Sequence, residues 1–149
     1  MLLITRSLAI FTILLTLSNC AANNYQNNKI VKNEKMQMIG LYNDNNNQSY
    51  FKDIDINVTP IGIKAMTSGN YPINHLNLME FDAGFETSYH NSINQQYIMV
   101  LEGVAEITAS NGEKRIIKAG DILFAADNAG KGHRTKTLTR VRIAVANVK

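Results

Sequence analysis

The sequence predicts an all-β protein, in which many short strands form one small sandwich or barrel. Polar and apolar residues alternate along the C-terminal part of the chain, most clearly from His133 to Val145. A period of two is typical of strands that bury one face. Turns rich in glycine and asparagine separate the short apolar runs, as in sandwiches and barrels. No window has the apolar spacing of an amphipathic helix.

Residues 1–20 have the layout of an export signal. Arg6 is the only charged residue before an apolar run from Leu8 to Leu17, which is shorter than the roughly 20 residues that span a bilayer. The letters "LSNC" then end at Cys20, and the segment resembles a bacterial lipoprotein signal. We therefore expect export to the cell envelope and a membrane anchor through a lipid on Cys20, with the domain facing the periplasm. Ordinary signal cleavage after Ala22 is the alternative.

Cys20 is the only cysteine in the chain. This count excludes an intramolecular disulfide, and it also excludes a redox or zinc motif built from paired cysteines. A domain that is exported without disulfides has to be held together by its hydrophobic core.

The segment 21–35 reads "AANNYQNNKIVKNEK" and predicts a flexible tether, because it is polar, rich in asparagine and without a period. The remaining residues, 36–149, have the length of a single domain. Once Arg6 is removed with the signal, 14 basic residues face 12 acidic ones. The mature protein is close to neutral, so no nucleic-acid partner is expected, since such a binder would have a clustered basic face.

The segment "VAEITASNGEKRIIK" from Val104 to Lys118 predicts a β-hairpin. Asn111-Gly112 is the strongest short-range hairpin signal, because a two-residue type I′ turn needs positive φ at both central positions. After the hairpin, "AGD" turns the chain into "ILFAA", a short apolar run that indicates a buried strand.

From His133 onward, the two faces of the predicted strand structure differ in charge. Basic side chains occupy one parity, at Arg134, Lys136, Arg140 and Arg142. The opposite parity carries no charge apart from the histidine and is therefore the expected interior; it comprises His133, Thr135, Thr137, Thr139, Val141, Ile143 and Val145.

Two segments together resemble the two motifs of the cupins. The first is "GFETSYHNSINQQYIMVLEG" (Gly84 to Gly103), and the second is "GDILFAADNAGKGH" (Gly120 to His133). More narrowly, "QQYIMVLEG" and "GKGH" resemble short bacterial cupin-domain proteins. The resemblance covers roughly Leu41 to Lys149. It implies a single small cupin barrel, of the double-stranded β-helix or jelly-roll type, for residues 36–149.

The resemblance also implies a metal site that is incomplete in this chain. Classical cupins bind metal through two histidines and a glutamate in the first motif and one histidine in the second. By position His90 and His133 match, whereas Ser92 and Gln96 replace a histidine and the glutamate. Catalytic zinc needs three protein ligands and non-haem iron two histidines and a carboxylate. We therefore expect His90 and His133, with Gln96 or Glu86, to bind iron, zinc, nickel or manganese weakly, unless the carboxylate of Glu86 or Asp127 completes the site.

The same positions predict where a small-molecule ligand would bind. His90, Gln96 and His133 are expected to converge inside the barrel mouth, with Asp127 as a further ligand contact. Each residue also has a structural alternative. His90 fits a solvent-facing loop, the Gln96 amide fits a hydrogen bond that ties the barrel together, and Asp127 fits a cap on its own turn.

Three functions are compatible with this sequence. The first is an envelope-tethered protein that binds a small molecule in its barrel without a complete classical metal site. The second is a metal-dependent cupin enzyme, such as an oxygenase or isomerase, that uses His90 and His133. The third is a structural or partner-binding lipoprotein. Two copies are expected to pair through sheet edges, as cupins often do.

Overall fold

The computed structural model describes residues 35–149, which form one compact unit. The predicted signal, Cys20 and all but the last residue of the tether lie outside the described residues. Within the described range, the chain has no helix long and apolar enough to cross a membrane.

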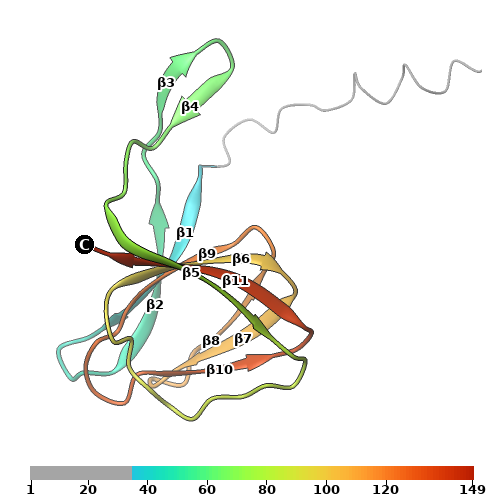
Figure 1. Cartoon of the computed structure of the whole chain (residues 1–149). Helices are drawn as coiled ribbons and strands as arrows, with labels where there is room; N and C mark the ends of the chain where they lie inside the picture. Colours follow the sequence, from blue (N-terminus) through green and yellow to red (C-terminus); the bar gives the residue numbers. More distant parts are fainter. Residues whose placement is uncertain (1–34) are drawn as a thin grey trace, which may run out of the picture. The chain divides into compact units, whose positions relative to one another are not determined.

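Eleven strands build the domain, and the described chain has no α-helix, so the predicted all-β fold class is confirmed. The strands, shown in Figure 1, are β1 (Gln37–Asn43), β2 (Ser49–Asp55), β3 (Thr59–Gly62), β4 (Ala65–Thr67), β5 (Ile73–Phe81), β6 (Gln96–Glu102), β7 (Val104–Ala109), β8 (Lys114–Lys118), β9 (Ile122–Ala126), β10 (His133–Thr137) and β11 (Val141–Val148).

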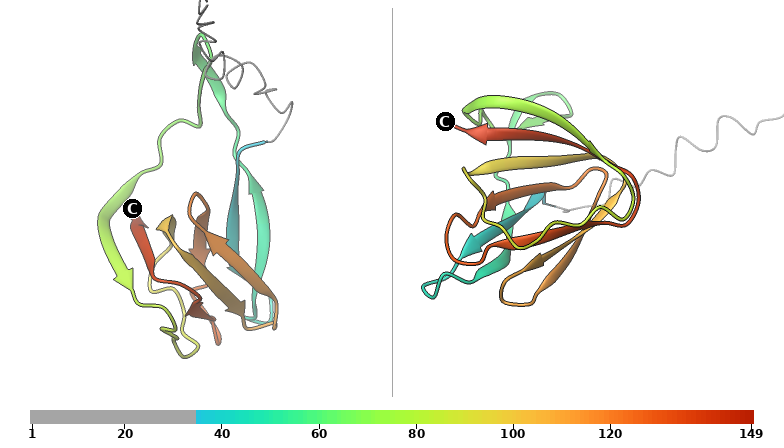
Figure 2. Two further views of the ribbon diagram at one scale, coloured as in Figure 1. Left: turned by 90° about the vertical axis from the view of Figure 1, so that its right-hand side faces the viewer. Right: turned by 60° about the horizontal axis from the view of Figure 1, so that its bottom comes forward.

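The strands form two facing sheets and one small hairpin. The larger sheet has the order β2-β1-β9-β6-β11-β5, and the smaller has the order β10-β7-β8. Neighbouring strands are antiparallel except for β1 and β9, which are parallel. The larger sheet curves around so that it faces the smaller one (Figure 2). This arrangement of two sheets is the jelly-roll barrel that the sequence predicted.

The hydrophobic core lies between the sheets, where both contribute their inward-facing apolar side chains. Its buried members include Leu41, Phe51, Val100, Ile107 and Leu123. These residues fill one part of the barrel and leave another part hollow, so the barrel combines a packed core with a cavity.

The interior parity predicted for the C-terminal strands is confirmed, but the chain turns a corner within this region. Strand β10 ends at Thr137 in the smaller sheet, and β11 begins at Val141 in the larger one. Thr139 helps to form the corner, where its hydroxyl accepts a hydrogen bond of 2.9 Å from the backbone N–H of Val104. The same residue parity continues on both sides, so His133 and Val145 line one cavity from different sheets.

The predicted hairpin exists between β7 and β8, but the expected two-residue type I′ turn is wrong. Asn111 does not have a positive φ, whereas Gly112 does, at 91°. The Gly112 N–H donates to the Ala109 carbonyl, and the Ala109 N–H donates to the Glu113 carbonyl, both at 2.9 Å. These bonds close a three-residue loop with glycine in the left-handed position, the other common way to join two antiparallel strands.

Apolar side chains are exposed on the edge strand β5 and on the β3–β4 hairpin. Leu78 is 74% exposed, and Ile63 in the hairpin turn is 95% exposed. The hairpin projects away from the barrel (Figure 1). Strand β5 pairs with β11 on one side only and is therefore an edge of the larger sheet. Pairing of two copies through sheet edges stays a prediction, and β5 is an edge available for it.

Candidate functional site

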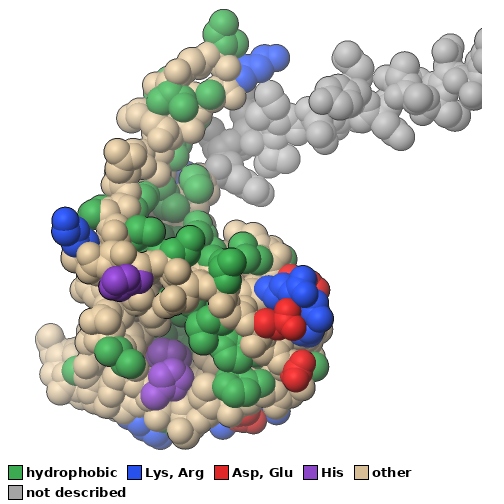
Figure 3. Space-filling view, in the orientation of Figure 1, with side chains coloured by type: hydrophobic (Ala, Val, Ile, Leu, Met, Phe, Trp, Pro, Cys, Tyr) green, Lys and Arg blue, Asp and Glu red, His purple; other side chains and the backbone are tan. Residues whose placement is uncertain are grey.

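A cavity of about 530 Å³ lies between the two sheets and opens to solvent. In the space-filling view, hydrophobic side chains are visible inside the hollow, with a histidine at its edge (Figure 3). The apolar part of its wall consists of Met79, Phe81, Phe85, Ile93, Ile98, Ala105, Ile107, Ile117, Leu123, Val141, Ile143 and Val145. The polar part consists of Asn77, Thr87, His90, Asn91, Ser92, Asn94, Gln96, His133, Thr135, Thr137 and Asn147.

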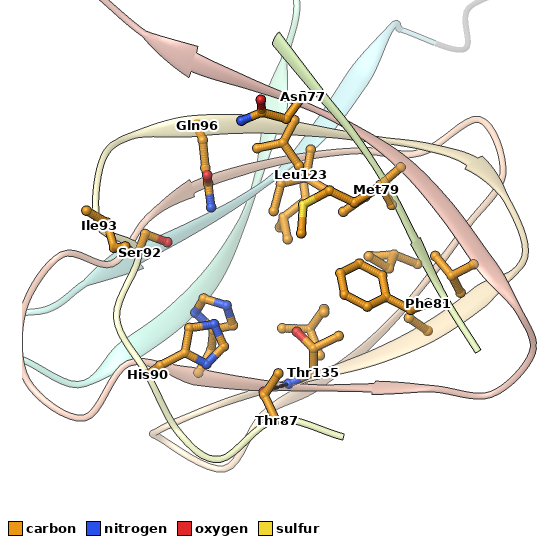
Figure 4. Close-up of a pocket in the computed structure, with 18 of the residues that line it drawn as sticks. Asn77, Met79, Phe81, Thr87, His90, Ser92, Ile93, Gln96, Leu123 and Thr135 are labelled. Carbon is orange, nitrogen blue, oxygen red and sulfur yellow. Dashed lines mark hydrogen bonds between the residues drawn. The ribbon is translucent and has the colours of Figure 1, made fainter. Parts of the chain in front are cut away.

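The wall formed by described residues contains no aspartate, glutamate, lysine or arginine. Its polar and apolar residues are interspersed: Asn77 lies on the same strand as Met79, and Ile93 lies beside Ser92. The close-up shows His90, Ser92 and Gln96 on one side of the cavity, whereas Met79 and Phe81 lie on the other (Figure 4). A ligand would therefore meet imidazole and amide groups on one side, and on the other side mostly apolar side chains together with the Asn77 amide.

The structure brings His90 and His133 together, as their motif positions predicted. The two residues form an isolated antiparallel bridge, with N–H to carbonyl hydrogen bonds of 2.8 Å and 2.9 Å in the two directions. Their imidazole rings lie with centroids 4.6 Å apart. His133 is 4% exposed, whereas His90 is exposed at the cavity mouth. The shared backbone bridge therefore holds the two histidine segments side by side.

Gly132 allows the two histidine segments to approach this closely. Its φ is 73°, and a methyl group added at its Cα would overlap the carbonyl oxygen of His90. Glycine lacks this methyl group and tolerates the left-handed conformation. The glycine just before His133 is therefore needed for the geometry of the site.

Asp127 does not line the cavity, which corrects its prediction as a ligand contact. Its side chain is fully buried beside His133. One carboxylate oxygen lies 2.7 Å from His133 Nδ1, and the other accepts a hydrogen bond of 2.8 Å from the Ser92 hydroxyl. Asp127 therefore holds two wall residues in place. Ser92, which replaces a histidine of the classical motif, serves as a partner of this carboxylate.

Gln96 points into the cavity from the start of β6 (Figure 4), as its parity predicted. In β6 it pairs with Ala125 of β9 on one side and Asn147 of β11 on the other. No described residue forms a hydrogen bond with the Gln96 side-chain amide, so the structural alternative, a hydrogen bond across the barrel, is not present.

Glu86 is excluded as a ligand of a metal in the cavity. It pairs with Arg134 at 3.1 Å and with Lys136 at 3.7 Å, and these two residues belong to the charged exterior face that the sequence predicted. Among residues 35–149, no group of three or more histidine, cysteine, aspartate or glutamate side chains is placed to hold a metal ion. The classical cupin ligand set therefore does not fit these residues.

Sequence reasoning missed the wall that β5 contributes. Asn77, Met79 and Phe81 face the cavity from this strand, and Asn77 lies opposite Val145 of β11. This part of the sequence carries no motif. Its alternating side chains were the only available signal, and they did not show which strand β5 would join.

Comparisons with known proteins do not assign a family to this chain. No protein-family model matches the chain, and no curated protein matches it. A conserved protein of unknown function from Streptococcus pyogenes is 24% identical with a TM-score of 0.43, and the match covers 50% of this chain and 62% of that one. The strand order and the facing sheets establish the all-β jelly-roll barrel.

Two other similar structures are cupins. A cupin superfamily protein from Desulfitobacterium hafniense is 18% identical with a TM-score of 0.41, covering 54% of this chain and 84% of that one. An RmlC-like cupin protein from Desulfovibrio desulfuricans is 19% identical with a TM-score of 0.40, covering 60% of this chain and 94% of that one. The function has to be argued from the cavity itself.

Proposed function

We propose that the domain binds a small, uncharged and largely apolar molecule inside its barrel. The observation that carries this proposal is the cavity of about 530 Å³, whose wall is mainly apolar and has no acidic or basic side chain among the described residues. The volume lies within the range of roughly 300 to 1,000 Å³ that is usual for ligand sites. A charged ligand would lose its hydration there without gaining an opposite charge.

The polar end of the cavity would fix the orientation of the ligand. His90, Gln96 and His133 approach it from three separate segments of the chain, and a few convergent polar groups in an apolar pocket are typical of a specific binding site. The ligand would place its polar group near the histidines and its hydrocarbon part against β5 and β11.

The metal-dependent enzyme is the less well supported alternative. Two imidazoles face the cavity, but the nearby Asp127 carboxylate contacts His133 through Nδ1 and lies outside the wall. A metal in the cavity would have two nitrogen ligands and the neutral Gln96 amide, short of the three protein ligands of a catalytic zinc or the facial triad of non-haem iron. The binding proposal therefore includes no step through a metal.

Binding of the uncharged fluorescent probe N-phenyl-1-naphthylamine tests the proposal. We expect the full-length protein to increase the fluorescence of the probe and shift its emission to shorter wavelength. Asn77→Trp should weaken this binding at least about tenfold, because the larger side chain fills the cavity from β5. The matched control is Leu78→Trp, on the outer face of the same strand, which should leave binding unchanged. No binding by the wild type, or equal binding by both variants, would contradict the proposal.

We also propose that the protein is anchored in the cell envelope through a lipid on Cys20. The support is the sequence "LSNC" after a short apolar run. Cys20→Ser should release the protein from the membrane fraction or block its processing, which fractionation and intact-mass measurement would detect. Unchanged processing and unchanged membrane association of this variant would show that the anchor is wrong.

A further inference from the structure

We propose that the cavity selects molecules that donate hydrogen bonds, because both histidines offer it an unprotonated Nε2 atom. This inference rests on the proposed binding function and defines the chemical class of the ligand. The expected ligand is uncharged, with an apolar body and a hydroxyl or N–H group. Carboxylates of the same size would be rejected.

In the neutral imidazole proposed for His133, the contact with Asp127 determines which ring nitrogen carries the proton. The carboxylate is 0% exposed, and a buried carboxylate needs hydrogen-bond donors. An ionised carboxylate only accepts hydrogen bonds. The Ser92 hydroxyl supplies one donor at 2.8 Å, and His133 Nδ1, at 2.7 Å, supplies the other. A neutral imidazole carries one N–H, so a proton on Nδ1 leaves Nε2 as an acceptor.

The position of the proton on the His90 ring follows in the same way, from a contact with a backbone carbonyl group. Its Nδ1 lies 3.0 Å from the backbone carbonyl oxygen of Ser88. A carbonyl oxygen accepts hydrogen bonds and donates none, so Nδ1 carries the proton here too. The Nε2 of the neutral ring is again an acceptor. The two imidazoles at the cavity mouth therefore have the same tautomer for independent reasons.

The two acceptors determine which polar group is favoured at this end of the cavity. A hydroxyl or amine can donate its proton to an imidazole Nε2. A carboxylate would place its lone pairs against those of the two nitrogens, and no lysine or arginine in the described wall offsets its charge. A buried polar group without a partner is destabilising, because it has lost its hydrogen bonds to water. The two Nε2 atoms thus favour ligands that donate a hydrogen bond over ligands that only accept one, and they also disfavour a negatively charged ligand.

Asp127→Asn distinguishes two roles of Asp127: setting the tautomer of His133, or only supporting the fold. The asparagine Oδ1 can still accept from Ser92, while its amide N–H can donate to His133 Nδ1. The imidazole proton would then move to Nε2, and the acceptor would become a donor. The matched control is Asp121→Asn, because this turn residue accepts from the Lys118 N–H outside the cavity wall.

Nitrogen-15 NMR of the histidine rings in the full-length protein near neutral pH reads the tautomer directly. We expect wild-type His133 and His90 to carry the proton on Nδ1, and Asp127→Asn to move it to Nε2 in His133 alone. The Asp121→Asn control should resemble the wild type. A wild-type His133 protonated on Nε2, or on both nitrogens, would overturn the inference even if Asp127→Asn fails to fold.

Binding of two matched probes tests the consequence. Wild type should bind 2-naphthol in preference to 2-naphthoate, and this preference should fall at least about tenfold in Asp127→Asn, with Asp121→Asn unchanged. Equal binding of both probes by the wild type would contradict the selectivity while leaving the proposed function intact. If neither these probes nor N-phenyl-1-naphthylamine binds, the proposed function itself fails, and the selectivity inferred from it fails as well.

Discussion

Replacing Gly132 with alanine is expected to lower the free energy of unfolding by about 2 to 5 kcal/mol. Two costs add at this position. The left-handed φ of 73° is unfavourable for alanine, and the new methyl group would overlap the carbonyl oxygen of His90. To relieve the overlap, the His90 segment has to move away from Gly132, which weakens its bridge to His133. Urea unfolding measures the loss, and binding of N-phenyl-1-naphthylamine should weaken in the same variant.

Gly84→Ala is the matched control for this substitution. Gly84 also has a left-handed φ, of 81°, but no atom lies within 4 Å of the position that its methyl group would occupy. Only the conformational cost remains, which is about 1 to 2 kcal/mol. A loss of stability in Gly132→Ala no greater than that in Gly84→Ala would show that the two histidine segments are not packed as described.

Asp127→Ala should be comparably destabilising, by about 2 to 6 kcal/mol, which is about 1 to 3 kcal/mol for each of two buried hydrogen-bonding groups left without a partner. The substitution removes the hydrogen-bond partner of two buried groups, the Ser92 hydroxyl and His133 Nδ1, which then have to remain unpaired or admit water. Urea unfolding again measures the effect. In the control Asp53→Ala, an exposed contact of 3.5 Å to Arg115 is lost, and surface ion pairs contribute little. Equal effects of the two substitutions would contradict the assignment of Asp127 as a buried support for the site.

The sequence predicted the faces of the strands better than their connections. The parity of His133, Val141 and Val145 correctly marked the interior, because a buried strand face imposes its period on the sequence directly. The corner at Thr139 was not predicted, since the parity continues across it without interruption. The turn at Gly112 was assigned to the wrong type, because Asn-Gly occurs in loops that differ by one residue.

The candidate site was only partly predictable for a related reason. His90 and His133 stand at motif positions, so their convergence was expected. The role of Asp127 depends on a contact with Ser92 across 35 positions, and no local pattern encodes such a contact. The contribution of Asn77 depends on β5 joining the edge of the larger sheet. Both features follow from sheet order, which alternation along one strand does not determine.

Metal analysis of the purified full-length protein, alongside a His90→Ala/His133→Ala double variant, shows whether the cavity binds a small molecule without holding a metal. An uncharged binding cavity with two imidazoles and no carboxylate in its described wall should retain iron, zinc, nickel and manganese at far below one equivalent, and the variant should match the wild type. Near-stoichiometric metal in the wild type that disappears in the double variant would contradict the account and favour the metal-dependent enzyme.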